Sequence, residues 1–314
     1  MLIHGDCLDV MRGMDANSVD AIITDPPYFR VKGEAWDNQW DTPAEFLAWV
    51  GLLCEQFERI LKPNGSLYFF ASPQMAARVE CEIGKRFAVL NSITWRKGAM
   101  GKSSVGWSQK TKKEALRMWL PETERIIFAE QRGEFGSPLG DAIRTARVRA
   151  GFRGTDVDVA LGYVRSKDPT RGTELCRRWE EGSSIPTADD YARALKACGD
   201  LREYEDLRRE YEDLRRPFNV TARDQWSDVW DFDPVQAYPG KHPCEKPLPL
   251  LCHILKASTK PGAVVFDPFS GSGSMGEACN ELGRQFIGVE KCPEYYTKAE
   301  RRLVAVKAQE RLFA

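Results

Sequence analysis

The stretch Val264 to Cys279, VVFDPFSGSGSMGEAC, predicts a strand, a glycine-rich turn and a helix in direct succession. The apolar run ends at Asp267, and glycines follow at positions 271 and 273. Glycine lets a ligand approach the backbone closely, and a helix N-terminus offers N–H groups that have no partner inside the helix. The alternative, a flexible linker, is disfavoured by the apolar strand on one side and the helix on the other. The spacing is not GxGxxG, so the dinucleotide-binding fingerprint fits poorly.

The next predicted strand, in QFIGVEK (Gln285 to Lys291), ends in an acid, Glu290. An acid at this place commonly accepts hydrogen bonds from ribose hydroxyls. A surface glutamate at a strand end is the plain alternative. The ribose-binding interpretation of Glu290 is favoured mainly because this residue follows Gly271 and Gly273 by one βα unit.

A second motif, AIITDPPYF (Ala21 to Phe29), ends another buried-looking strand with an acid, two prolines and a tyrosine. Asp25 precedes Pro26, which favours extended backbone at the aspartate. The two prolines stiffen the chain and remove two N–H donors, which leaves carbonyl groups free to accept hydrogen bonds. By itself, this motif would be an ordinary proline turn at the end of a strand.

Strand patterns and helix patterns alternate in the two parts of the chain on either side of the insert, residues 1–131 and 217–314. In TPAE (Thr42 to Glu45), an N-cap threonine, a first-turn proline and a glutamate form a capping box, and the helix should run up to KPNG (Lys62 to Gly65). The alternation predicts an α/β fold with a doubly wound sheet of parallel strands. The other expected strands are 2–4, 19–24, 66–72, 88–97 and 123–131. The other expected helices are 73–87, one that begins at a proline within 242–258, and the last twenty residues.

Between Leu139 and Gly199 the chain is helical in pattern, rich in arginine and interrupted by glycines. The unit REYEDLR then occurs twice in tandem (202–208 and 209–215), with Tyr204, Leu207, Tyr211 and Leu214 at a/d heptad spacing. Two heptads are too short to stand alone, so a helical spacer or a minor dimer contact is expected. Helices are expected near 139–150, 155–163, 170–181 and 187–198, as an all-helical insert at 132–216 between domain parts 1–131 and 217–314.

Composition narrows the class of protein. A net charge of −1 gives no support for nucleic-acid binding, so any basic surface must be local. Nine scattered cysteines without a CxxC pair, and only three histidines, predict no metal site and a reducing cytoplasm. The first residues, MLIHGDCLDV, lack a secretory signal, and no apolar run approaches the ~20 residues of a membrane span.

Three motifs in this order, DPPY, HPCEKP (His242 to Pro247) and DPFSGSGS, resemble the DNA amino-methyltransferases that use S-adenosylmethionine. The order resembles the circularly permuted beta class, in which the catalytic motif precedes the cofactor motif, and the resemblance covers roughly 1–131 and 217–314. It implies a Rossmann-like methyltransferase sheet and a cytoplasmic phage or prokaryotic enzyme. The implied catalytic residues are Asp25, Pro26, Pro27 and Tyr28, and the implied cofactor-binding residues are Asp6, Cys7, Asp25, Lys246, Asp267, Pro268, Phe269, Ser270, Gly271, Ser272, Gly273 and Glu290.

The resemblance implies that Asp6 contacts the cofactor's adenine, that Glu290 holds the ribose, and that Lys246 closes the cofactor pocket. An exocyclic amine on a base is a weak nucleophile because its lone pair is delocalised. If the Asp25 carboxylate and the Pro26 carbonyl accept its two N–H hydrogens, the lone pair is freed for an in-line displacement accelerated mostly by positioning. The target base must leave the duplex, and Tyr28 is expected to stack on it. In the resembled family, aspartate rather than serine at the first motif position favours N6-adenine over N4-cytosine.

Two regions are expected to contact double-stranded DNA. Residues 95–118 carry seven basic residues against Glu114 alone and contain three glycines, which suits a phosphate clamp better than a merely solvated loop. The insert resembles a phage-repressor helix-turn-helix through CRRWEEGSSIPTADDYARAL, which implies a helix near 170–181 in the major groove; a helical subdomain that only packs or dimerises is the alternative. The predicted contacts are Arg96, Lys97, Lys102, Lys110, Lys112, Lys113, Arg171, Thr173, Arg177 and Arg178, with Thr170 on the same helix.

The leading hypothesis is therefore a site-specific DNA adenine N6-methyltransferase. The alternatives are a DNA cytosine N4-methyltransferase and a DNA-binding regulator with a vestigial methyltransferase fold. Members of the permuted class often pair, so a homodimer is compatible with the heptad helix, and a cognate restriction endonuclease is a possible partner.

Overall fold

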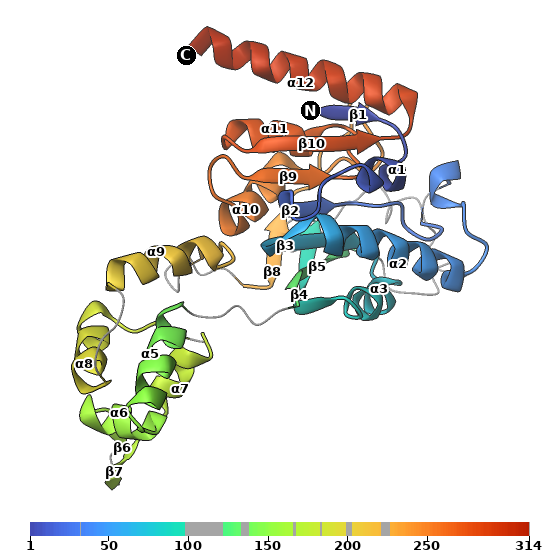
Figure 1. Ribbon diagram of the computed structural model, residues 1–314. Helices are drawn as coiled ribbons and strands as arrows, with labels where there is room; N and C mark the ends of the chain where they lie inside the picture. The colour runs from blue at the N-terminus through green and yellow to red at the C-terminus, as the bar shows by residue number, and fades with distance from the viewer. Residues whose placement is uncertain are drawn as a thin grey trace. The chain divides into compact units, whose positions relative to one another are not determined.

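The structure, a computed structural model, describes residues 1–31, 33–97, 122–132, 138–165, 168–182, 184–198, 203–220 and 227–313. The chain divides into two compact units. The sheet unit comprises residues 1–132 and 216–314, and the helical unit comprises residues 133–215 (Figure 1). Each unit has a hydrophobic core of its own.

One eight-stranded sheet is the centre of the sheet unit, and all of its neighbouring strands are parallel except for two pairs, in which β5 runs antiparallel to β3 and to β4. The predicted α/β sheet fold is confirmed, but the prediction of parallel strands throughout was wrong for β5. Because β5 follows β4 along the chain and runs back beside it, this pair needs no crossover helix. The strand order is β1 (Leu2–His4), β10 (Gln285–Glu290), β9 (Val264–Asp267), β2 (Val19–Thr24), β3 (Leu61–Ala71), β5 (Thr123–Gln131), β4 (Phe87–Lys97) and β8 (Val229–Phe232).

Strand β8 was not predicted, because its four residues belong to a polar, aromatic segment that resembles a loop. It pairs in parallel with β4, and the Trp95 Nε1–H group donates a hydrogen bond to the Phe232 carbonyl at 2.9 Å. Strand β3 begins at Leu61, although KPNG was expected to form a turn before Ser66. The turn-like residues fit into β3 because its register with β2 shifts between Val19 and Ala21.

The helices of the sheet unit cover both faces of the sheet (Figure 1). The hydroxyl of Thr42 accepts the Glu45 N–H at 3.2 Å and caps α2, as the capping box predicted. One predicted helix was too long, because α3 is limited to Ala76–Ile83. Helix α10 begins at Leu248, directly after Pro247, which agrees with the helix expected to begin at a proline of this segment. The helices are α1 (Cys7–Arg12), the 3₁₀ helix η1 (Ala35–Asp37), α2 (Pro43–Ile60), α3, α10 (Leu248–Ser258), α11 (Ser274–Glu281) and α12 (Pro293–Phe313).

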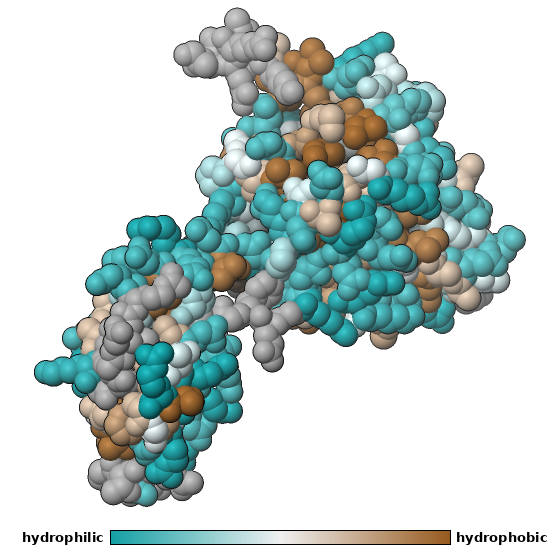
Figure 2. Space-filling view, in the orientation of Figure 1, coloured by the Kyte–Doolittle hydropathy of each residue, from teal (hydrophilic) through white to brown (hydrophobic). Residues whose placement is uncertain are grey.

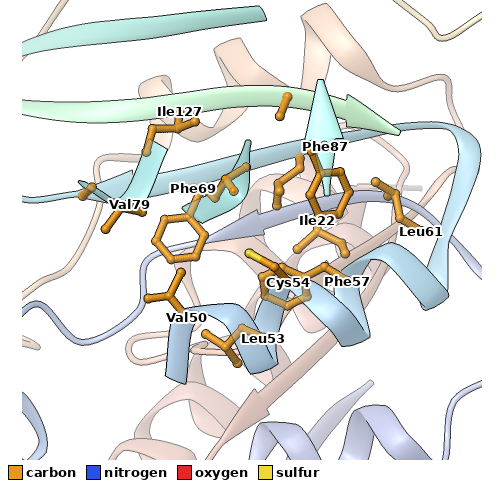
Figure 3. Close-up of a cluster of buried hydrophobic side chains, with 14 of the residues drawn as sticks. Ile22, Val50, Leu53, Cys54, Phe57, Leu61, Phe69, Val79, Phe87 and Ile127 are labelled. Carbon is orange, nitrogen blue, oxygen red and sulfur yellow. The ribbon is translucent and has the colours of Figure 1, made fainter. Parts of the chain in front are cut away.

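Alternate residues of the central strands point to opposite faces, so the sheet has two cores. Phe69 of β3 packs with Ile22 of β2 and with Val50 and Phe57 of α2, as Figure 3 shows, whereas Phe70 packs towards α10 and α11. Truncating one such buried phenylalanine to alanine costs about 3–5 kcal/mol. In the view of Figure 2, hydrophilic residues cover most of the surface and hydrophobic residues gather in smaller areas. Among the described residues, no helix combines the length and the apolar character needed to cross a membrane.

The helical unit differs from its prediction at the helix expected near 170–181. Thr170 and Arg171 lie in strand β7 (Asp168–Gly172), which forms a hairpin with β6 (Val164–Arg165), and Thr173 lies in the connection that follows. Only α7 (Leu175–Glu180) is helical. The other helices lie close to their predicted positions: α5 (Pro138–Arg149), α6 (Gly154–Ala160), α8 (Ala188–Cys198) and α9 (Tyr204–Leu214).

The buried carboxylate of Asp158 explains where α7 begins. It accepts the N–H groups of Leu175 at 3.0 Å and Cys176 at 2.7 Å, which are the first two residues of the helix.

The tandem heptads also have a different role from the one expected. Leu207 is fully buried in the core of the helical unit and the Tyr204 ring lies 5.5 Å from the Tyr191 ring, so the first heptad is core rather than a spacer.

We predict that Asp158→Ala destabilises the helical unit by about 1–3 kcal/mol for each amide left unsatisfied in the buried site. Urea unfolding of the full chain measures the loss, and faster hydrogen exchange at the Leu175 and Cys176 amides locates it. Asp141→Ala is the control, because Asp141 is exposed and its ion pair with Arg144 is long, at 3.7 Å. A loss of stability no larger than that of the control would contradict the role of Asp158.

Candidate active site

The sequence motifs meet at one edge of the sheet. Asp25 follows the last residue of β2, Asp267 ends β9 and Glu290 ends β10, and these parallel strands all finish on the same side. A cavity of about 350 Å³ opens there. Ligands bind at this edge in open α/β sheets. The predicted residues that line the cavity are Asp6, Cys7, Asp25, Pro26, Pro27, Tyr28, Lys246, Asp267, Pro268, Phe269, Ser270, Gly271, Ser272 and Glu290.

Glu290 holds the glycine-rich turn in place. One carboxylate oxygen accepts the Gly271 N–H at 2.8 Å and the other accepts the Cys292 N–H at 2.7 Å. Since a carboxylate offers about four acceptor positions, Glu290 retains capacity for further donors from a ligand. Burial raises the pKa of Glu290 above its usual value, although these backbone N–H groups oppose the shift.

The two glycines of the turn have different roles. Both have positive φ angles, +49° at Gly271 and +76° at Gly273, which glycine adopts without steric cost. Gly271 lines the cavity, and an added Cβ would lie 3.0 Å from the His242 ring. Gly273, a predicted cofactor residue, is not among the lining residues; its place near Cβ of Ala299 instead lets α11 approach α12.

Asp6 and Cys7 lie at the end of β1, where α1 begins. The Asp6 carboxylate caps α1 by accepting the Leu8 N–H at 2.9 Å, and it accepts a second hydrogen bond from the Lys291 ammonium at 3.0 Å. Burial raises the pKa of the Cys7 thiol to about 12. The thiol is therefore protonated at neutral pH and unsuited to act as a nucleophile.

Asp267 is also buried, and this burial raises its pKa to about 8, with the negative charges of Asp25 and Glu290 adding to the shift. Its carboxyl group accepts the Phe269 N–H at 3.1 Å. Aromatic side chains that the sequence did not suggest, His242 and Tyr295, also line the cavity. The His242 ring lies 4.3 Å from the Tyr295 ring, and burial lowers the pKa of His242 to about 4, which keeps it neutral.

The DPPY aspartate belongs to a largely buried charge cluster that consists of Asp25, Tyr28, Lys97, Glu124 and Lys246. One Asp25 oxygen accepts the Tyr28 hydroxyl at 2.8 Å, and the other accepts the Lys246 ammonium. Glu124 accepts a hydrogen bond from the same hydroxyl at 3.2 Å and forms an ion pair with Lys97. Its carboxylate also lies 3.6 Å from Lys246 Nζ. Side-chain exposure is only 17% for Asp25, 13% for Glu124 and 8% for Lys246.

Burial and neighbouring charges together shift the pKa values of Asp25, Glu124 and Lys246 in different directions. Burial raises the pKa of Asp25, even though the Lys246 ammonium opposes the shift. Burial also acts to raise the pKa of Glu124, but Lys246 and Lys97 together bring it below its usual value. For Lys246 the two carboxylates outweigh burial, so its pKa is above its usual value.

Glu124 was missed from the sequence because it is a single acid at the start of TERIIFAEQ, outside every motif. Its strand was predicted correctly, but its partners come from three other places in the chain, which are DPPY, Lys97 and Lys246. The available signal was weak: Glu124 is a single acid two residues before the buried run that begins at Ile126.

The predicted DNA contacts have varied surroundings. Arg96 makes a two-pronged ion pair with Asp231 on the neighbouring strand, at 2.7 and 2.5 Å, and Lys97 pairs with Glu124. Arg177 and Arg178 are exposed on α7, and Arg177 lies near Glu174 and Glu181. Lys102, Lys110, Lys112 and Lys113 lie outside the described residues. Within the described part of the chain, no group of three or more His, Cys, Asp or Glu side chains is arranged to hold a metal ion.

A family model described as DNA methylase (N6_N4_Mtase) matches residues 19–301. The DNA adenine methyltransferase YhdJ of Escherichia coli (strain K12) is 26% identical over 313 residues, which cover 96% of this chain and 82% of the relative. The type II methyltransferase M2.DpnII of Streptococcus pneumoniae is 25% identical over 326 residues, covering 97% and 90%.

Solved structures share the fold. The M1.HpyAVI–SAM complex matches with a TM-score of 0.54 and 20% identity, covering 96% of this chain and 98% of that one. The putative DNA modification methylase TTHA0409 of Thermus thermophilus, complexed with S-adenosyl-L-methionine, matches with a TM-score of 0.53, 20% identity and coverage of 97% and 95%. The PvuII DNA methyltransferase (cytosine-N4-specific) matches with a TM-score of 0.54, 14% identity and coverage of 97% and 90%.

We predict that Cys7 resists alkylation in the folded chain. With a pKa of about 12, its thiol stays protonated at pH 8, whereas N-ethylmaleimide reacts with the thiolate. Peptide mass spectrometry after labelling should find Cys81, which is exposed, modified and Cys7 unmodified, and urea should make both react. Labelling of Cys7 at a rate close to that of Cys81 without urea would show that the cavity wall is open.

Proposed function

Because the chain belongs to the DNA methylase family, we propose that it is a site-specific adenine N6-methyltransferase that acts on double-stranded DNA. The observation that carries the proposal is a single cavity lined both by Asp25 and Pro26 and by the glycine-rich turn held by Glu290. The methyl donor is S-adenosylmethionine, and the protein is a methyltransferase of the adenine-specific class. The motif order supports placement in the permuted beta class.

The cavity suits the cofactor chemically. When bound, S-adenosylmethionine supplies an electrophilic methyl group on a sulfonium. The remaining lone pairs of Glu290 suit ribose hydroxyls, and Asp6 lies at the same edge of the sheet and suits the amine of the cofactor's adenine. The Phe269 ring, 5.7 Å from the Trp49 ring, provides an apolar wall.

Asp25 and Pro26 suit the target amine. The Asp25 carboxylate and the Pro26 carbonyl are acceptors, so they can accept hydrogen bonds from the two N–H groups of an exocyclic amine. These hydrogen bonds free the lone pair of the amine for attack on the methyl group. A base inside a duplex cannot reach a cavity of this kind, so the target base is flipped out, with the Tyr28 ring as its stacking surface. Positioning then supplies most of the acceleration.

Adenine is the proposed base because an aspartate begins the DPPY motif and because YhdJ is named an adenine methyltransferase. The same fold also occurs in an enzyme named cytosine-N4-specific, so the fold does not choose between the two bases. Nucleoside analysis chooses between them directly.

The helical unit is the proposed target-recognition part. A long recognition helix at 170–181 is excluded by the β6–β7 hairpin, so the contacts are assigned to Arg177 and Arg178, which α7 exposes. A homodimer and a cognate restriction endonuclease are further proposals, in line with the type II name of M2.DpnII. Analytical ultracentrifugation of the full chain tests the dimer, and a monomer at every concentration would exclude it.

We predict that DNA from cells expressing the chain contains N6-methyladenine, whereas Asp25→Asn lowers methyl transfer by about 10²- to 10⁴-fold, the contribution of a positioned acid–base group. Mass spectrometry of digested DNA measures the product. Calorimetry with S-adenosylmethionine should show that the variant still binds the cofactor, because Glu290 and the glycine-rich turn are intact.

Asp20→Asn is the matched control on the same strand. Asp20 accepts from Lys62 and from the Val264 N–H, both away from the cavity, so this variant should methylate DNA. N4-methylcytosine as the product would overturn the choice of base. An Asp25→Asn variant with wild-type activity would overturn the mechanism.

We predict that replacing both Arg177 and Arg178 with alanine weakens DNA binding and alters the profile of methylated sites. Each lost phosphate contact should lower the slope of the logarithm of the binding constant against the logarithm of salt concentration by about one. A lost base contact should instead relax the base preference at one position of the target site. Binding at several salt concentrations and sequencing of methylated sites provide the measurements. Arg153→Ala, at an exposed arginine of the same unit, is the control; an unchanged slope and profile in the double variant would remove α7 from the interface.

A further inference from the structure

Glu124 lies on β5, a strand that carries none of the sequence motifs, yet its carboxylate lies beside the DPPY aspartate. One oxygen is held by the Lys97 ammonium. The other accepts the Tyr28 hydroxyl at 3.2 Å and lies 3.6 Å from Lys246 Nζ. Glu124 is therefore close to both groups that donate to Asp25.

This arrangement poses a problem for the reaction. Both oxygens of Asp25 accept hydrogen bonds in the structure, one from Tyr28 and the other from Lys246. A target amine that donates to Asp25 must take the place of at least one of these donors. A displaced ammonium or hydroxyl left without an acceptor in a largely buried site would oppose binding of the base.

Glu124 provides the acceptor that these donors need. The Tyr28 hydroxyl is already within hydrogen-bond distance of Glu124, and a displacement of well under 1 Å would bring Lys246 from 3.6 Å to a normal hydrogen-bond length. The charges also balance, because Asp25 and Glu124 face Lys97 and Lys246. Moving Lys246 from one carboxylate to the other leaves that balance unchanged and requires no proton transfer.

We propose that Glu124 is a positioning residue that receives Lys246 and the Tyr28 hydroxyl when the target amine takes their place on Asp25. The proposal rests on the proposed function, since the incoming donor is the amine of the flipped base. Without the Glu124 carboxylate, Lys246 remains on Asp25 and competes with the substrate. Lys97 holds the far oxygen of Glu124 and so keeps the near oxygen directed at the cluster.

Glu124→Gln tests the proposal, because the amide keeps the shape of the side chain and removes the charge. We expect kcat for DNA methylation to fall about 10- to 100-fold, the range for a lost hydrogen bond to a charged group in a buried site. Binding of S-adenosylmethionine should be unchanged, because the glycine-rich turn and Glu290 do not contact Glu124. Glu124→Asp, which restores the carboxylate, should recover part of the loss.

A double-mutant cycle with Lys246→Met separates positioning from a general structural effect. If Glu124 acts by accepting Lys246, adding Glu124→Gln to Lys246→Met should change kcat much less than it does in the wild type. Additive losses would overturn the proposal.

The pH profile provides a second readout. The groups that influence Asp25 or its neighbours in the cluster are Tyr28, Lys97, Glu124, Cys244, Lys246 and Asp267, and the negative charge of Glu124 raises the pKa of Asp25. Activity requires ionised Asp25, so the acidic limb of kcat should move to lower pH in Glu124→Gln. A purely structural defect would lower the activity without moving this limb.

Glu130→Gln is the matched control, because Glu130 lies on the same strand and pairs with Arg216 at 2.6 Å outside the cluster. It should keep the wild-type kcat and pH profile. Wild-type methylation together with an unchanged Glu124→Gln variant would overturn the inference alone. A wild-type chain that methylates no base would overturn the proposed function and, with it, the inference.

Discussion

The parallel pairing of β2 with β9 is the constraint on which the site depends. Ala21 and Ile22 pair with Val265 and Phe266, which come from opposite ends of the chain. The Asp20 carboxylate accepts the Val264 N–H at 2.8 Å where the two strands begin, at the end away from the cavity. Because the two strands run in the same direction and in this register, Asp25 and Asp267 finish at one edge, close enough for the charge of Asp25 to raise the pKa of Asp267. The DPPY motif and the glycine-rich turn thereby line one cavity.

Such a concentration of buried charge is explained by chemistry rather than by stability. Removing ions from water costs several kcal/mol per ion, and a buried ion pair often stabilises a fold no better than apolar side chains of similar size. The cluster around Tyr28 nevertheless places two carboxylates and two ammonium groups at the end of the sheet. Perturbed pKa values in a cavity are typical of functional sites. Asp25, with a raised pKa, and Glu124, with a lowered one, show how neighbouring carboxylates acquire different behaviour from their surroundings.

The helical unit shows the limits of local pattern. Its helices α5, α6 and α8 lie close to their predicted positions, and apolar residues such as Ile143 of α5 and Tyr191 of α8 are buried in the core. The segment 170–173 was expected to be helical and is not, because Asp158, a residue of α6, accepts the first amides of α7 and sets its beginning at Leu175. Leu207 likewise belongs to a heptad pattern that suggested a helical spacer or a minor dimer contact, yet it is buried in the core of the helical unit. In both cases a partner distant in sequence decided the outcome.

Local patterns were enough to predict the strands 2–4, 19–24 and 123–131, the capped start of α2 and the motifs that line the cavity, because strand patterns, caps and glycine turns are local properties of the chain. Local patterns could not predict that β5 runs antiparallel or that VWDF forms an edge strand, since strand pairing depends on residues far apart in sequence. The tertiary structure also decided that Glu124 joins Asp25, Tyr28 and Lys246. Electrostatic partnership depends on distance in space, and no spacing along the chain records that distance.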